Sequence, residues 1–263
     1  MLSVPRHESV KVDFGVFGGS GFSEFAESAE SVSLETPYGA PSTDVAVAVV
    51  DGVRIGFLSR HGAGHTIPAH RVNYRANVWA LAHLGAQSIL APFACGSLRA
   101  DRKPGELVIV DQLIDRTYGR ECTFFDGPET WHQGFADPYS SELGTIIAKT
   151  IETLGHTVHR GGTVVVVPGP RFSTRAEANW HRSIGADLVN MTQYPESVLA
   201  SEVGLPYCGI GIVTDFDAGH EEDETIAAVH EDDVFALLAR HAAIMRQIIS
   251  ASASRVAGVN APS

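Results

Sequence analysis

The sequence predicts a single α/β domain in which a mixed central β-sheet is flanked by helices. Short runs rich in valine and isoleucine alternate with stretches of helical spacing, which is the pattern of a sheet covered on both faces. Four of the helical stretches end at a glycine, a residue that commonly terminates helices. The 263 residues contain neither a repeat nor a linker. We therefore expect one domain over residues 1–263, with a core at about 11–250 and frayed ends.

The individual elements follow from local patterns. Apolar runs of the strand type cover residues 12–17, 45–50, 53–58, 87–93, 106–110, 162–167 and 207–213. Helical spacing predicts helices over residues 74–84, 141–154, 175–184 and 195–203. A long closing helix is expected over residues 231–255, because its apolar side chains recur at intervals of three and four.

Composition indicates which classes of partner and which cellular compartment to expect. The formal net charge of −12 opposes binding to nucleic acids and to anionic lipid surfaces, since both require a basic footprint. The N-terminus lacks the layout of a secretory signal, and no apolar run is long enough to span a bilayer. Cys95, Cys122 and Cys208 are odd in number and widely spaced, which fits neither a disulfide framework nor a zinc site. We expect a soluble cytoplasmic protein without nucleic-acid or membrane partners.

Two motifs at the ends of predicted strands have the chemistry of an anion site. Gly18 and Ser20 belong to a glycine-rich turn after the first strand, whose N–H groups and hydroxyl can bind an anion, although a tight turn is the commoner meaning. Arg60 and His61 follow the strand over residues 53–58, and His65 comes shortly after them. A guanidinium and an imidazole at the carboxyl end of a strand favour a phosphate site, with a solvated polar loop as the alternative.

Small residues follow another predicted strand. Ala94, Cys95 and Gly96 leave room for a flat ligand to approach the backbone, and a simple strand-ending turn explains the same residues. Arg99 is the only cation close to Cys95 in the sequence, and no histidine is adjacent. We therefore do not expect a nucleophilic thiol.

Aromatic and acidic residues mark the last two motifs. Phe172, followed by Ser173, could stack on an aromatic ring, while a core phenylalanine beside a helix cap is the ordinary alternative. Asp215 and Asp217 follow the strand over residues 207–213, where carboxylates are costly unless one is protonated or binds a ligand. In an extended strand they would face the same side. An exposed acidic loop is the alternative.

Taken together, these segments resemble the trimeric purine nucleoside phosphorylase superfamily, and most closely its methylthioadenosine phosphorylase branch. The resemblance covers roughly residues 12–249. The stretches that carry it are residues 60–62 with 65–67, 71–81, 94–98, 111–117, 169–173, 190–192 and 214–217.

The resemblance implies a fold, an assembly and a set of site residues. It implies the nucleoside phosphorylase fold, a homotrimer, phosphate as co-substrate, and no metal or organic cofactor. Asp215, Ser20 and His61 would be catalytic, with a protonated Asp215 near purine N7. The implied phosphate ligands are Gly18, Ser20, Arg60, His61, Ala94 and Thr192; the implied nucleoside contacts are His65, Cys95, Gly96, Met191 under the ribose, Phe172 on the purine, Ser173, Asp215 and Asp217 at its edge, and His132 from the neighbouring subunit.

The activity that this resemblance implies is phosphate-dependent cleavage of 5′-methylthioadenosine to adenine and 5-methylthioribose 1-phosphate. Asp217 favours adenine, because a carboxylate accepts a hydrogen bond from a 6-amino group and repels a 6-oxo group. The alternatives are a phosphorylase for adenosine, 2′-deoxyadenosine, a 5′-halogenated deoxyadenosine, methylthioinosine or inosine. A catalytically silent nucleoside-binding protein is a further alternative from another class.

The sequence also departs from that branch. Phe93 stands where a hydroxyl residue near phosphate is usual, and Pro168 stands where an acidic residue is common. Gln193 and Tyr194 replace the usual residues after the Asn-Met-Thr segment. The loop over residues 218–233, which usually lines the 5′ pocket, aligns poorly; His230 within it could hydrogen-bond a 5′-hydroxyl.

Overall fold

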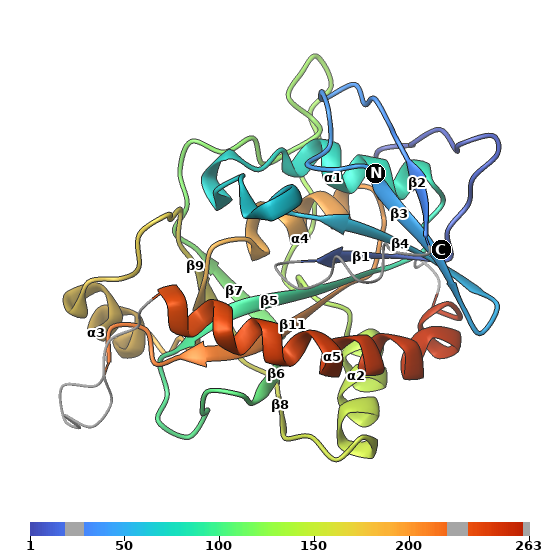
Figure 1. Ribbon diagram of the computed structural model, residues 1–263. Helices are drawn as coiled ribbons and strands as arrows, with labels where there is room; N and C mark the ends of the chain where they lie inside the picture. The colour runs from blue at the N-terminus through green and yellow to red at the C-terminus, as the bar shows by residue number, and fades with distance from the viewer. Residues whose placement is uncertain (19–28, 220–230, 260–263) are drawn as a thin grey trace.

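The computed structural model describes residues 1–18, 29–219 and 231–259, and within them eleven strands form one mixed sheet (Figure 1). The seven predicted strands are β1 (Phe14–Gly18), β3 (Val45–Val50), β4 (Val53–Ser59), β5 (Ile89–Ser97), β6 (Leu107–Ile109), β9 (Thr163–Val166) and β11 (Tyr207–Asp215). Four short strands are additional to the prediction: β2 (Glu30–Val32), β7 (Gln112–Asp115), β8 (Val158–Arg160) and β10 (Leu188–Asn190).

β5 is the central strand of the sheet. It runs parallel to β1 and β11 and antiparallel to β10, and β4 runs parallel to β1. Because parallel strands end at the same edge of a sheet, the residues that follow β4, β5 and β11 come together there. β3 and β2 extend the sheet beyond β4, β6 and β8 extend it beyond β11, and β9 and β7 extend it beyond β10.

The five predicted helices are all present, with their ends within two residues of the prediction. They are α1 (Tyr74–His83), α2 (Ser141–Thr153), α3 (Arg175–Ser183), α4 (Gln193–Glu202) and α5 (Glu231–Val256). The side chains of Asn73, Ser140 and Thr174 cap α1, α2 and α3, and Thr174 forms a capping box with Glu177. The hydroxyl before α3 therefore has the capping role that its position in the sequence suggests.

The helices cover the sheet in two layers. α1 and α4 pack together on one face, and α2 and α5 pack together on the other (Figure 1). In β1, Phe14 and Val16 join the core under α2 and α5, whereas Phe17 joins the core under α1 and α4. A Cβ at Gly15 would lie 2.5 Å from Leu81 Cδ1. Glycine at this position therefore lets α1 approach β1 closely.

α5 is the longest of the described helices. Over residues 234–256 it is long and apolar enough, by length and composition, to cross a membrane. In this structure it packs against β11, β5 and α2, and Met245, Ile248 and Ile249 are fully buried there. Its apolar face is therefore part of the domain core, and its first turns reach the site described below.

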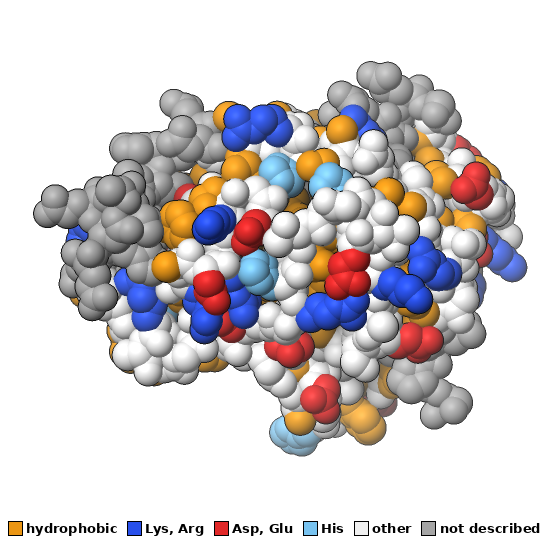
Figure 2. All heavy atoms as spheres, turned by 90° about the horizontal axis from the view of Figure 1, so that it is seen from below, with side chains coloured by type: hydrophobic (Ala, Val, Ile, Leu, Met, Phe, Trp, Pro, Cys, Tyr) orange, Lys and Arg blue, Asp and Glu red, His pale blue; other side chains and the backbone are white. Residues whose placement is uncertain are grey.

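The surface carries charges of both signs. On the face shown in Figure 2, basic and acidic side chains are interspersed. This pattern is that of an ordinary solvated surface, with opposite charges close to one another.

Candidate active site

A cavity of about 470 Å³ opens at the carboxyl ends of β4, β5 and β11. Its volume is within the usual range of small-molecule sites. The short helices η2 (Ala63–His65) and η3 (Ala69–Arg71), the loop over residues 167–173 and the first turns of α5 contribute to its walls. The sequence-predicted residues that line it are Arg60, His61, His65, Ala94, Cys95, Gly96, Phe172, Ser173, Met191, Thr192, Asp215 and Asp217.

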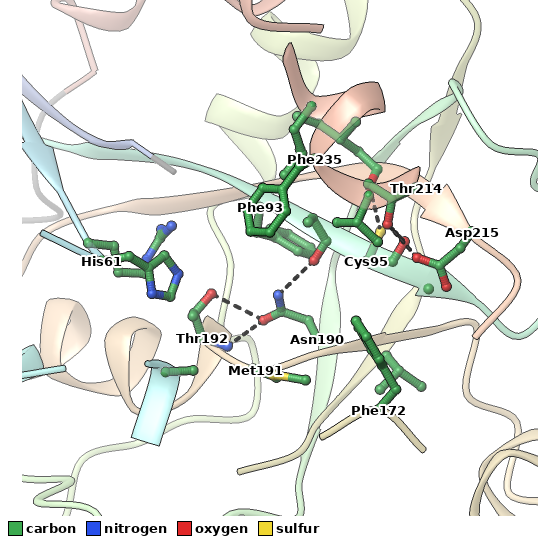
Figure 3. A pocket seen from close by; sticks show the side chains of 18 of the residues that line it. His61, Phe93, Cys95, Phe172, Asn190, Met191, Thr192, Thr214, Asp215 and Phe235 are labelled. Carbon is green, nitrogen blue, oxygen red and sulfur yellow. Dashed lines mark hydrogen bonds between the residues drawn. The ribbon is translucent and has the colours of Figure 1, made fainter. Parts of the chain in front are cut away.

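These residues are distributed between two chemically different ends. Figure 3 shows His61 and Thr192 at one end of the cavity, Phe172 and Asp215 at the other, and Asn190 and Met191 between them. We call the part lined by Arg60, His61 and Thr192 the arginine end. The part lined by Phe172, Ser173, Asp215 and Asp217 is the carboxylate end.

Three predicted residues do not line the cavity in the described structure. Gly18 is buried at the end of β1, and its carbonyl oxygen accepts a hydrogen bond from the Arg60 backbone N–H at 3.0 Å, so it lies beside the arginine end. Ser20, like His230, lies outside the described residues. His132 is exposed and does not line the cavity of its own chain. Its role across a subunit interface stays a prediction.

Arg60 is held at the arginine end by a partner that the sequence patterns did not reveal. Its Nε and Nη2 donate to the two carboxylate oxygens of Glu196 at 2.6 and 2.8 Å, and both side chains are almost fully buried. The Tyr207 hydroxyl donates to the same carboxylate at 2.7 Å. Burial alone would lower the pKa of Arg60, but Glu196 raises it, so the guanidinium stays charged. The two residues are 136 positions apart, and no spacing rule connects them.

His61 is the second polar group of the arginine end. Burial, reinforced by the charge of Arg60, lowers the pKa of His61 to about 4, so the ring is neutral near pH 7. Its Nδ1 lies 2.9 Å from the carbonyl oxygen of Ile67. Since a carbonyl only accepts, we assign the proton to Nδ1. Nε2 then keeps its lone pair and can accept a hydrogen bond from a P–OH group or a sugar hydroxyl.

Asn190 fixes the middle of the cavity. Its Nδ2 donates to the Ala94 carbonyl at 2.9 Å, and its Oδ1 accepts from the backbone N–H groups of Thr192 and Gln193 at 2.7 and 2.8 Å. The end of β5 is thereby tied to the turn between β10 and α4. This link places Met191 and Thr192 in the cavity wall, with Asn190 itself as a lining residue.

Asp215 ends β11 with both carboxyl oxygens engaged. Oδ1 accepts from the Asp217 backbone N–H at 2.7 Å, and Oδ2 lies 2.6 Å from Thr214 Oγ1. Thr214 Oγ1 also lies 3.2 Å from the Cys95 carbonyl oxygen. The Thr214 hydroxyl donates to Asp215 over the shorter of these two distances, so Thr214 and the Asp217 backbone N–H fix the orientation of the carboxyl group. Burial raises the pKa of Asp215 above its ordinary value, although the hydrogen bonds from Thr214 and from the Asp217 backbone N–H lower it in part.

Asp217 faces the same cavity through a different backbone geometry from the one expected. It adopts a left-handed conformation, with φ 53°, so the extended-strand argument for both carboxylates facing one side was wrong, although both line the cavity. Gly96 makes room for this turn, because a Cβ there would lie 2.9 Å from Asp215 Oδ1 and 3.0 Å from Asp217 Cβ. Burial, together with the nearby charge of Asp215, raises the pKa of Asp217 to about 6.

Apolar side chains form the remaining walls. Phe172 is 40% exposed at the carboxylate end, so it is not a core residue. Phe93, the departure from the usual hydroxyl residue, lines the cavity and is buried. Helical spacing predicted an apolar face on α5 but did not separate core positions from cavity positions. The α5 residues that line the cavity are Val234, Phe235, Leu238, Ala242 and Met245.

Cys95 lines the cavity as a protonated thiol. Its Sγ donates to the Ile212 carbonyl at 3.4 Å, and burial raises the pKa of Cys95 well above its ordinary value. A thiolate is therefore disfavoured, in agreement with the expectation that Cys95 is not a nucleophile.

Comparison with known proteins gives this arrangement a family. A model of the phosphorylase superfamily matches residues 13–250. The chain belongs to the phosphorylase superfamily. It is 47% identical over 236 residues to S-methyl-5′-thioadenosine phosphorylase of Mycolicibacterium smegmatis, covering 89% of this chain and 88% of that protein. It is 45% identical over 231 residues to purine nucleoside phosphorylase of Streptomyces coelicolor, covering 85% of this chain and 82% of that protein.

A solved phosphorylase structure agrees with the fold. Methylthioadenosine phosphorylase from Schistosoma mansoni, in complex with adenine, matches with a TM-score of 0.87 and 37% sequence identity. The match covers 96% of this chain and 93% of that one. The nucleoside phosphorylase fold expected from the sequence is therefore confirmed for this member of the phosphorylase superfamily.

Proposed function

We propose that this chain cleaves 5′-methylthioadenosine with inorganic phosphate, giving adenine and 5-methylthioribose 1-phosphate. The observation that carries the proposal is the pairing of the arginine end with the carboxylate end in one cavity. The arginine end suits the phosphate anion. The carboxylate end suits the 6-aminopurine of the nucleoside. The names of the relatives support the same reaction, since several are S-methyl-5′-thioadenosine phosphorylases.

The chemistry follows from where charge develops. As the C1′–N9 bond breaks, its electron pair leaves with the purine, and the sugar becomes cationic. A phosphate oxygen, held by Arg60, His61 and Thr192, forms the new bond to C1′. The proton on Asp215 passes to purine N7 and neutralises the leaving base. Phosphate is consumed as co-substrate, and the step requires no organic cofactor.

The two nucleoside positions that set specificity lie on different walls. At the carboxylate end, Asp217 accepts a hydrogen bond from the 6-amino group while Phe172 stacks on the ring. The apolar wall from α5 suits a methylthio group better than a hydroxyl, because a polar group buried there would lose its water. This wall favours methylthioadenosine over adenosine.

The second candidate is a purine nucleoside phosphorylase that takes a 5′-hydroxyl nucleoside. Two observations favour it. One is the name of the Streptomyces coelicolor relative. The other is His65, a cavity residue whose ring centre lies 5.2 Å from the ring centre of Phe235. An imidazole beside the α5 wall offers a hydrogen-bond partner to a 5′-hydroxyl.

A substrate panel separates these candidates. Purified protein is incubated with phosphate and with methylthioadenosine, adenosine, 2′-deoxyadenosine, 5′-chloro-5′-deoxyadenosine, methylthioinosine or inosine, and free base is measured by chromatography. The proposal predicts that kcat/KM is highest for methylthioadenosine. A higher value for adenosine would support the second candidate, and a preference for inosine would contradict the role given to Asp217.

We also propose that the working enzyme is a cytoplasmic homotrimer. Trp131 is 51% exposed beside His132, and Tyr118 is 78% exposed in the same long connection between β7 and α2. Aromatic residues are enriched at protein–protein interfaces relative to the rest of the surface. The trimer would bring His132 of one subunit toward the cavity of the next. Three cysteines without disulfides suit a reducing compartment.

A further inference from the structure

Arg120 is a partly buried cation whose guanidinium donates to backbone carbonyls. It lies in the connection between β7 and α2 and does not line the cavity. Its Nη1 donates to the carbonyl oxygens of Met191 and Tyr194 at 2.8 and 2.6 Å, and its Nη2 donates to that of Pro168 at 3.0 Å. Hydrogen bonds from a charged donor are about twice as strong as neutral ones. The guanidinium therefore binds three fixed points of the main chain at once.

The three carbonyls belong to two neighbouring segments that both line the cavity. Pro168 begins the loop that leads to Phe172 and Ser173 at the carboxylate end. Met191 lies in the turn from β10 into α4, and Tyr194 lies in the first turn of α4, where its own backbone is not helical. The loops are in close contact, because a Cβ at Gly169 would lie 2.5 Å from Met191 Sδ. Arg120 therefore adds hydrogen bonds that join the same two segments.

The same cation reaches a third wall through Tyr74. The Arg120 guanidinium carbon lies 5.4 Å from the centre of the Tyr74 ring, within the range of a cation–π contact. The Tyr74 hydroxyl donates to the carbonyl of Ala69, a cavity residue in η3, at 2.9 Å. The arginine and the tyrosine therefore join three of the segments that line the cavity.

We infer that Arg120 is a positioning residue, which sets the separation between Phe172 on the base side and Met191 on the sugar side. This inference rests on the proposed function of the cavity. Arg120 contacts no substrate group and acts through the two loops. Thr192 is independently held by Asn190, so the phosphate contacts depend less on Arg120 than the nucleoside contacts do. Lysine cannot replace the arginine fully, because its donors share a single nitrogen.

The test compares Arg120→Gln and Arg120→Lys with the wild-type enzyme. The KM for methylthioadenosine, the KM for phosphate and kcat are measured separately, and thermal melts report folding. We expect kcat/KM for methylthioadenosine to fall about 10- to 100-fold in Arg120→Gln, since small misplacements of reacting groups cost this much. The KM for phosphate should change less than about threefold, because Asn190 holds Thr192 without Arg120. The fall in kcat/KM for Arg120→Lys should lie between those of wild type and Arg120→Gln. If Arg120→Gln does not fold, Arg120→Lys carries the same test.

Arg6→Gln is the matched control. It removes a guanidinium that donates to a backbone carbonyl, that of Ala82 at 2.8 Å, from a part of the domain that does not line the cavity. Unchanged nucleoside constants in folded Arg120 variants would overturn the inference, as would equal losses in both KM values. A wild-type protein with no activity on any nucleoside would instead contradict the proposed function.

Discussion

At the scale of single residues, the cavity holds titratable groups in the states that phosphorolysis needs. His61 is neutral and Arg60 is charged, because burial acts on both and only Arg60 has a carboxylate partner. At the other end, burial raises the pKa of both Asp215 and Asp217, and that of Asp217 reaches about 6, so Asp217 is mainly ionised near pH 7. Asp217 is therefore available as a hydrogen-bond acceptor at the base, and an uncompensated positive charge is avoided at the histidine.

Asp217→Asn should flatten the dependence of stability on pH. The folded carboxyl titrates near 6 and the unfolded one near 3.8, so the folded state binds more protons between these values. The contribution of Asp217 to stability is therefore full below about pH 4 and is lost as the pH rises through 6. We expect the variant to gain about 1.4 kcal/mol of unfolding free energy relative to wild type between pH 5 and pH 8, measured by denaturant unfolding.

Asp51→Asn is the control for this comparison. Asp51 has the same left-handed conformation, with φ 49°, but lies exposed in the turn between β3 and β4. Asparagine tolerates that conformation at both sites. The gain in unfolding free energy relative to wild type, between pH 5 and pH 8, should be larger for Asp217→Asn than for Asp51→Asn. Equal gains in the two variants would contradict the buried-carboxylate account.

Some site residues could be predicted from local patterns and others could not. Arg60 and His61 are basic residue types at a strand end in an acidic chain, and that pattern indicated an anion site. Phe172 required the family resemblance, because a single phenylalanine is more often a core residue. Glu196 and Arg120 were not predicted as site residues, since their contacts join segments distant in sequence and exist only after folding.

At the scale of elements, one apolar stripe of α5 forms part of the domain core and part of the cavity wall. Met245 belongs to the core and also lines the cavity, while Leu238 is half-buried at the cavity wall. Helical periodicity predicted the stripe correctly. It could not show where the stripe leaves the core, because core and ligand wall require the same apolar residue types.

Leu238→Asn should reduce the preference for a 5′-methylthio group. A polar side chain on the α5 wall removes apolar contact worth about 1.4 kcal/mol, or tenfold in affinity. We expect the KM for methylthioadenosine to rise about tenfold while that for adenosine changes little. Ala236→Asn, on the exposed side of α5, is the control. An equal effect on both nucleosides would show that the 5′ group lies elsewhere.

The strands show where prediction at this scale ends. The seven longer apolar runs were predicted, with shifted boundaries. β2, β7, β8 and β10 have only three or four residues each, too few for a period of two to stand out from chance. They form because neighbouring strands supply the hydrogen-bonding edge, as β9 does for β7 and β10.

At the scale of the whole molecule, the alternation of strands and helices was enough to predict an α/β domain. The branching of the sheet at β5, which pairs with β1, β10 and β11, was not predictable from periodicity. That branching brings together the strand ends that line the cavity.

The trimer has a direct test in solution. Sedimentation equilibrium at micromolar concentration should give the mass of three chains, and Trp131→Glu should shift it toward one, because a charge would be buried in the contact. Val49→Glu changes another exposed hydrophobic residue, outside the connection between β7 and α2, and is the control. A wild-type mass of one chain would contradict the assembly and the role of His132.

The central claim is that phosphate, not water, accepts the sugar. The most direct measurement is ³¹P NMR of the wild-type protein with methylthioadenosine and inorganic phosphate, with adenine followed in the same sample. The account predicts a sugar 1-phosphate signal that grows in equal amount with adenine, and no adenine release without phosphate. Adenine release that continues without phosphate, or no turnover of any nucleoside, would contradict it.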